Sequence, residues 1–116
     1  MDAPDIQTAV PVRRYAVGDY TGVLLHEITS RDAARYHFIL AFVAFGESSP
    51  LLYITAEEAT GESGRPATVV RVIAEGGARV LGPNERWCEL DAFADDALQM
   101  ACKVLGLEGE EPRRLL

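Results

Sequence analysis

Residues 36–45, with the sequence YHFILAFVAF, contain no charged residue, no glycine and no proline. Aromatic and β-branched residues of this kind are typical of a strand, because their side chains pack well on a pleated surface. Strand side chains point alternately to opposite faces, so one face would carry Tyr36, Phe38, Leu40, Phe42 and Ala44, and the other His37, Ile39, Ala41, Val43 and Phe45. Both sets are largely apolar, which predicts a central strand of a sheet that is covered on both sides.

Shorter segments on either side of residues 36–45 also have the composition of strands. They are residues 12–17, 20–28, 51–56, 67–75 and 78–81, separated by turn-forming residues. Gly22 interrupts one of these strands and indicates a bulge or a close approach of another backbone segment. Gly76-Gly77 predicts a two-residue hairpin turn, because both positions tolerate positive φ.

The hydrophobic period changes from two to about 3.6 after Gly82-Pro83-Asn84, which predicts a helix over residues 85–105. Asn84 is a suitable N-cap, and Gly106 occupies the position of a C′ glycine. The apolar stripe of this helix consists of Leu90, Phe93, Ala94, Ala97, Ala101, Val104 and Leu105.

These elements predict a single α+β domain over residues 1–116, with residues 1–11 and 107–116 mobile. Its architecture would be an antiparallel meander of five or six strands with one long C-terminal helix on one face. No second helix is available for the other face. Strong curling into a barrel-like roll, a second copy of the chain, or a bound partner or ligand would cover it. We favour a homodimer, with Ile39, Val43 and Phe45 as expected interface residues.

The charge distribution narrows the choice of partner. The chain has 116 residues and a net charge of −7. Residues 85–111 hold eight acids against Arg86 and Lys103, a local charge of −6. This negative field disfavours nucleic acid and anionic membranes as partners, whereas the acidic helix surface at Asp91, Asp95 and Asp96 would suit a basic protein.

The cellular location is suggested by what the chain does not contain. No apolar run approaches the roughly 20 residues that span a bilayer, and the N-terminal residues lack the pattern of a secretory signal. These features indicate a cytoplasmic protein, in which Cys88 and Cys102 would be reduced thiols.

The familiar catalytic motifs are missing from the sequence: there is no phosphate loop, GxGxxG, CxxC, HExxH or GxSxG. We therefore expect no cofactor and no metal, and we favour a non-catalytic protein over an enzyme. One cluster has open alternatives. If Ile28 lies opposite Tyr36, then Glu27 pairs with His37; a shift of one residue places His26 opposite His37, which resembles half of a metal site. Two ordinary strand histidines are the simpler interpretation.

Two further features bear on binding. A pocket between strand 36–45 and the helix could be lined by His26, His37, Tyr36, Tyr53 and Trp87. Arg71 lies within an apolar strand and would need an acidic partner if its face is covered.

The sequence thus supports three functional hypotheses. The first is a small, homodimeric, non-catalytic interaction or assembly module. The second is a small-molecule-binding protein or enzyme that uses the pocket just described. The third, an acidic inhibitor that mimics nucleic acid, ranks last because only part of the chain is strongly acidic.

Overall fold

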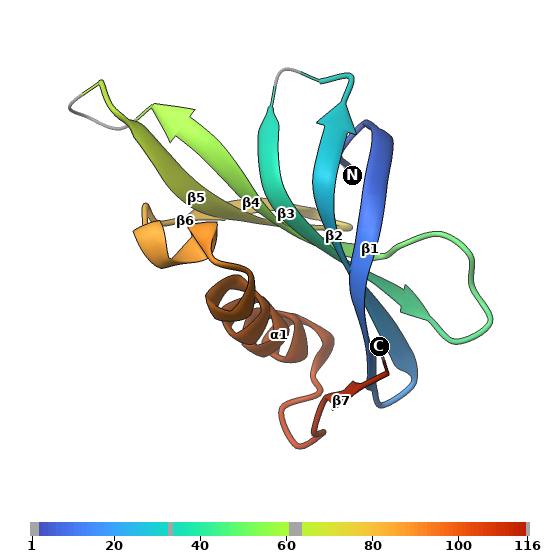
Figure 1. The fold of residues 1–116 in the computed structure, drawn as a ribbon. Coiled ribbons are helices and arrows are strands. Elements are labelled where there is room, and N and C mark those ends of the chain that lie inside the picture. The colour runs from blue at the N-terminus through green and yellow to red at the C-terminus, as the bar shows by residue number, and fades with distance from the viewer. Residues whose placement is uncertain (1–2, 33, 61–63, 116) are drawn as a thin grey trace.

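The structure is a computed structural model and describes residues 3–32, 34–60 and 64–115. Its strands are β1 (Ile6–Val17), β2 (Tyr20–Ser30), β3 (Arg35–Ala44), β4 (Leu52–Thr60), β5 (Pro66–Ala74), β6 (Gly77–Leu81) and β7 (Arg113–Arg114). Its helices are the 3₁₀ helix η1 (Glu85–Cys88) and the α-helix α1 (Leu90–Leu105). The predicted α+β class is confirmed (Figure 1).

The strands form one antiparallel sheet in the order β6-β5-β4-β3-β2-β1-β7, with β3 at its centre. Among the described residues the sheet has seven strands, so the predicted count of five or six is too low, and β7 is the strand that was not predicted. This strand comes from a segment expected to be mobile, and it pairs Arg113 with Ala16 and Arg114 with Tyr15. The other segment expected to be mobile contributes the first half of β1, where Pro11 is tolerated because the strand lies near the edge of the sheet.

The predicted helix is divided into two pieces. The Asn84 side chain accepts a hydrogen bond from the Arg86 N–H at 3.0 Å and so caps η1. Glu89 then adopts an extended conformation, with φ −100° and ψ 135°, and separates η1 from α1. Gly106 ends α1 with φ 70°, and its N–H bonds to the last carbonyls of the helix, which confirms its predicted role.

The hairpin turn lies one residue earlier than the sequence predicts. Ala74 pairs with Gly77, so the two turn residues are Glu75 and Gly76 rather than Gly76 and Gly77. Gly77 is the first residue of β6 and retains a positive φ of 143°. The pair of glycines therefore predicts the hairpin correctly, but the position of its turn is wrong by one residue.

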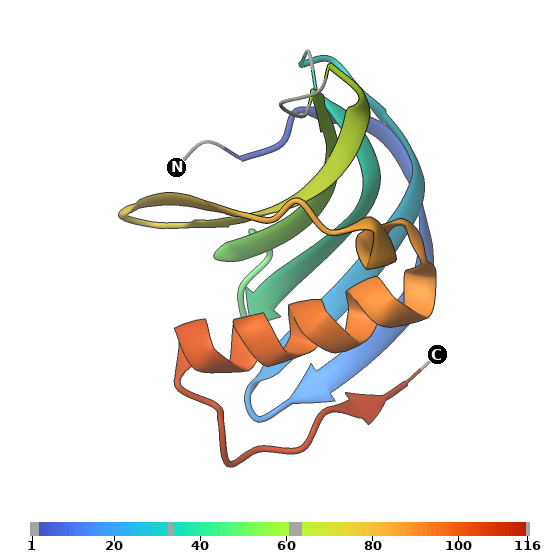
Figure 2. The ribbon, with the colours of Figure 1, turned by 90° about the vertical axis from the view of Figure 1, so that its left-hand side faces the viewer.

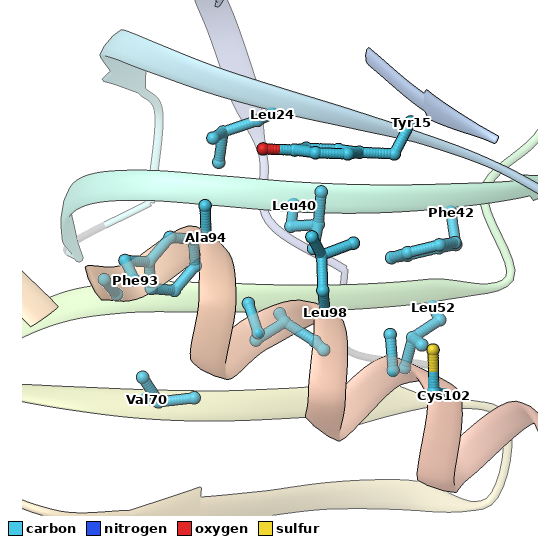
Figure 3. Close-up of a cluster of buried hydrophobic side chains, with 14 of the residues drawn as sticks. Tyr15, Leu24, Leu40, Phe42, Leu52, Val70, Phe93, Ala94, Leu98 and Cys102 are labelled. Carbon is cyan, nitrogen blue, oxygen red and sulfur yellow. The ribbon is translucent and has the colours of Figure 1, made fainter. Parts of the chain in front are cut away.

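Helix α1 packs across one face of the strongly bent sheet (Figures 1 and 2). Leu24, Leu40 and Phe42 on the strands are fully buried against the helix, as are Phe93 and Ala101 on α1 (Figure 3). The rings of Phe38 and Phe93 stack with centroids 5.5 Å apart. This interface is the hydrophobic core of the domain.

Within the described residues no helix covers the opposite face of the sheet, yet the centre of that face is also buried. Ile39, Thr55 and Ile73 have no exposed surface in the single chain. The sheet is bent and twisted (Figure 2), and such bending allows side chains of neighbouring strands to cover one another. The curling considered from the sequence therefore provides part of the cover.

A bulge in β3 changes which side chains share a face. Tyr36 pairs with Glu57 and Phe38 pairs with Ala56, so His37 is the extra residue. Tyr36 consequently lies on the same face as Ile39, whereas simple alternation groups it with Phe38. The expected face assignment is wrong for Tyr36 and also for His37, which faces η1 together with Thr68 instead of sharing the face of Ile39, because a bulge interrupts the alternation.

Gly22 is explained by close packing rather than by a bulge. A Cβ atom added there would lie 2.9 Å from Cζ of Phe42, whose side chain is fully buried. We expect Gly22→Ala to reduce the free energy of unfolding by about 1–3 kcal/mol through overpacking. Urea denaturation measures this, with Gly109→Ala as control because nothing lies within 4 Å of its added Cβ. Equal stabilities of the two variants would contradict the prediction.

Candidate functional site

The side of the sheet turned away from α1 is called the open face here. Paired residues of adjacent strands project to the same side, so the strand register defines its composition. Two rows cross this face from β6 to β2: Ala78, Ile73, Tyr53, Ala41 and Val23 form the first, and Val80, Arg71, Thr55, Ile39 and Leu25 form the second.

Apolar side chains around the buried centre of the open face remain accessible to solvent. Val23, Leu25, Val43 and Tyr53 are partly exposed. Val80 on β6 is 63% exposed, and Phe45, immediately after β3, is 91% exposed. The open face thus has a closed centre with an apolar margin.

A buried ion pair lies within the open face. Arg71 donates to Glu57 twice, from Nε to Oε2 at 2.8 Å and from Nη2 to Oε1 at 3.0 Å. Thr55 Oγ1 donates to the same Oε2 at 2.7 Å. The Glu57 side chain is 10% exposed and the Arg71 side chain 28%. Glu57 is therefore the acidic partner that Arg71 was expected to need, although no spacing in the sequence identifies it.

Tyr36 lies next to the bulge in β3, where it pairs with Glu57 of β4, and adds a further polar side chain to this part of the open face. Its hydroxyl donates to Oδ2 of Asp32 at 2.8 Å. Burial raises the pKa of Tyr36 far above its ordinary value, with further contributions from the bond to Asp32 and the charge of Glu57. Burial alone would raise the pKa of Asp32, but hydrogen bonds from Asp5, Tyr36 and Ala34 lower it overall. Tyr36 therefore stays a neutral donor and is unsuited to act as a base.

Charge is distributed unequally between the two sides of the molecule. Between β6 and β2, Arg71 is the one charged residue in the two rows of the open face, and Glu57 neutralises it. On β1, the exposed Arg14 pairs with Val23 and continues the first row. The acidic excess of residues 85–111 belongs to η1, α1 and the segment after α1. Asp91 and Asp96 on α1 are paired with Arg13 and Arg86 respectively. A basic partner at the helix would thus meet two acids that already have intramolecular partners.

The side chains predicted to bind a ligand do not converge. Tyr36 and Tyr53 belong to the open face, whereas Trp87 is buried in the core on the α1 side and donates to Asp96 Oδ2 at 2.9 Å. His26 pairs with Val10 across the β1–β2 ladder. The space between β3 and α1, where the pocket was expected, is occupied by core side chains that include Leu40, Phe42 and Phe93.

The histidine cluster is not assembled either. Leu25 pairs with Ile39, and continuing this register by two residues would place Glu27 opposite His37. The β2–β3 ladder ends at Leu25, however, and the backbone of Glu27 departs from strand geometry with a φ of 49°. Across residues 3–32, 34–60 and 64–115, no group of three or more His, Cys, Asp or Glu side chains is arranged to hold a metal ion.

His37 instead faces a shallow hollow that also contains Cys88. Glu58, Thr68 and Glu85 line it as well, and its volume is about 490 Å³. Sγ of Cys88 lies 2.8 Å from Oγ1 of Thr68, and both cysteines are free thiols. The sequence did not predict that His37 and Cys88 lie near each other, because only the packing of η1 beside β5 brings them together.

A second hollow, here called the tail hollow, lies between the C-terminal half of α1, β1 and the segment after the helix. Its volume is about 680 Å³. The lining residues are Tyr15, Asp95, Leu98, Gln99, Cys102, Lys103, Glu108, Glu110, Glu111, Pro112 and Arg114. Because residues 107–116 were expected to be mobile, no feature of the sequence pointed to this site.

Comparisons with known proteins assign no function to the hollows or to the open face. Among the helices that the structure describes, none is both long and apolar enough to cross a membrane. No protein-family model, no curated protein and no solved structure matches the chain.

Proposed function

We propose that the protein is a non-catalytic assembly module that forms a homodimer through the open face of its sheet. The observation that carries this proposal is the apolar margin of the open face, formed by side chains of β2, β3, β4 and β6 that stay accessible in the single chain. Several exposed apolar side chains on one face of a sheet are a common feature of interaction sites.

Electrostatics does not oppose a second copy as the occupant of the open face. The whole chain has a net charge of −7, so most contacts between two copies would bring like charges together. The open face avoids this repulsion, because Glu57 neutralises the one charged residue of its rows. Two open faces can therefore meet with little electrostatic cost.

The expected interface residues need one revision. Ile39 has no exposed surface in the single chain, so it cannot contact a partner. Val43 and Phe45 remain accessible, and Val23, Leu25, Tyr53 and Val80 join them. The proposed interface is therefore the margin of the open face rather than its centre.

Sedimentation of the full chain over a concentration series tests the dimer. We expect a mass near twice 12.6 kDa for the wild type. Val80→Asp and Phe45→Asp should each weaken dimerisation by about 100-fold, because each would place an unpaired charge in an apolar interface.

Val104→Asp is the matched control. Val104 is a valine on α1 that is 50% exposed and lies away from the open face. This variant should dimerise like the wild type. A wild-type chain that stays monomeric, or a Val104→Asp variant as impaired as Val80→Asp, would contradict the proposal.

The alternative, a small-molecule-binding protein or enzyme, has support in a different place from the one expected. The hollow shared by His37, Thr68 and Cys88 combines a thiol, a hydroxyl and an imidazole. The filled space between β3 and α1 offers no comparable support.

A further inference from the structure

The tail hollow is walled by a segment that is attached at both ends. Residues 107–115 run from the end of α1 beneath the helix to β7 (Figure 2). The Leu107 N–H donates to the Cys102 carbonyl at 2.7 Å, and the Leu115 N–H donates to the Arg14 carbonyl at 2.7 Å. The wall is therefore part of the folded domain and depends on the β1–β7 pairing.

The floor of the tail hollow is apolar. Tyr15 is 6% exposed, and Leu98 and Cys102 are each 9% exposed, so only small parts of these side chains face the hollow. All three belong to the hydrophobic core cluster (Figure 3). An apolar group placed here would continue the core outward.

The rim of the tail hollow is acidic. The rim carries four negative charges and two positive charges, a net charge of −2. The negative charges belong to Asp95, Glu108, Glu110 and Glu111, and the positive charges to Lys103 and Arg114. Burial, followed by the charge of Glu108, raises the pKa of Cys102. The thiol therefore remains neutral, and the negative field of the rim extends to the floor.

We infer that the tail hollow binds a small organic cation with an apolar body, of the arylalkylamine class. The hydrocarbon part would lie on Tyr15, Leu98 and Cys102, and the ammonium group would be held by the rim carboxylates. A neutral analogue would bind more weakly because the rim carboxylates would not attract it, and an anion would be repelled by them. A hydrated inorganic cation would leave the apolar floor unused. This inference does not depend on the homodimer, because α1 and the tail hollow lie on the other side of the sheet.

Cys102 provides a direct readout of occupancy. In a full-length Cys88→Ser variant, Cys102 is the sole remaining thiol. Its alkylation by iodoacetamide would be followed while 2-phenylethylamine, 2-phenylethanol or phenylacetate is titrated. We expect the amine to protect Cys102 at about tenfold lower concentration than the alcohol, because one favourable charge contact commonly contributes about that factor. Phenylacetate should give no protection.

A charge-matched pair of variants locates the effect. Glu108→Gln/Glu111→Gln removes two rim charges and should weaken protection by the amine about tenfold while leaving protection by the alcohol unchanged. Glu47→Gln/Glu75→Gln removes the same charge from exposed turns elsewhere and should leave both unchanged.

Three results would overturn the inference. The first is no protection by the amine, the second is equal protection by amine and alcohol, and the third is equal weakening in the two double variants. The last would assign the effect to net charge rather than to the rim. Repeating the titration in the Val80→Asp background separates the two proposals, because loss of the dimer should leave protection of Cys102 intact.

Discussion

Glu57→Ala is expected to lower the free energy of unfolding by about 3 kcal/mol, because it leaves the Arg71 guanidinium on the open face without its partner. Removing one member of a buried ion pair costs about 3–5 kcal/mol. The lower end applies here, since the Arg71 side chain keeps 28% of its surface exposed and water can solvate it in part. The Thr55 hydroxyl, fully buried, loses its acceptor at the same time. Urea denaturation monitored by circular dichroism measures the change.

Glu58→Ala is the control for this prediction. Glu58 is the next residue of β4, is exposed, and should change stability by less than about 0.5 kcal/mol. The double variant Glu57→Leu/Arg71→Met removes both charges and should recover most of the loss, because apolar replacement of a whole buried pair is often close to neutral. Equal effects of Glu57→Ala and Glu58→Ala would show that the ion pair contributes nothing to stability.

Gly82→Ala is expected to be comparably destabilising, by about 3 kcal/mol, for a steric reason. A Cβ atom at Gly82 would lie 2.6 Å from Cζ3 of Trp87, whose ring is 6% exposed and held by its bond to Asp96. The φ of Gly82 is also 107°, a region that L side chains rarely adopt. Overpacking and backbone strain each cost about 1–3 kcal/mol, so their sum exceeds the effect of either alone.

Gly76→Ala separates the two contributions. Gly76 has nearly the same φ, 103°, but nothing lies within 4 Å of its added Cβ. This control should therefore show only the strain, about 1–2 kcal/mol. Because Trp87 is the only tryptophan in the chain, its fluorescence should shift in Gly82→Ala and not in Gly76→Ala. Equal losses of stability in both variants would exclude the contact with Trp87 as the cause.

The buried ion pair also bears on the proposed homodimer. An unpaired arginine at the centre of this face would oppose an apolar partner. With its guanidinium held by the two oxygens of Glu57, Arg71 adds little net charge to the surface. In the proposed homodimer, Glu57→Ala should therefore weaken assembly as well as stability.

The fold was predictable where the determining interactions are local along the chain. The apolar run at residues 36–45 identified the central strand, since hydrophobic residues without charge or turn formers must be buried. Asn84 and Gly106 marked helix ends because capping acts over two to four residues. Gly22 indicated a bulge or a close backbone approach, whereas the group that approaches it is the side chain of Phe42.

The candidate sites were less predictable because they depend on register and on contacts between distant elements. The bulge at His37 moved Tyr36 to the open face, and a one-residue change of this kind leaves no mark in the hydrophobic pattern. The tail hollow required β7, a two-residue strand whose pairing with β1 comes from tertiary context rather than from the propensity of two arginines.

By itself, the sequence determined the α+β class, the central position of residues 36–45 and an amphipathic helix after the sheet, because each follows from periodicity over a few neighbouring residues. Only the tertiary structure decided that Glu57 neutralises Arg71, that Ile39 is buried without a helix, and that the chain after α1 folds back against Tyr15. These outcomes depend on how far the sheet bends and which strands pair, and those are set by the packing of the whole domain.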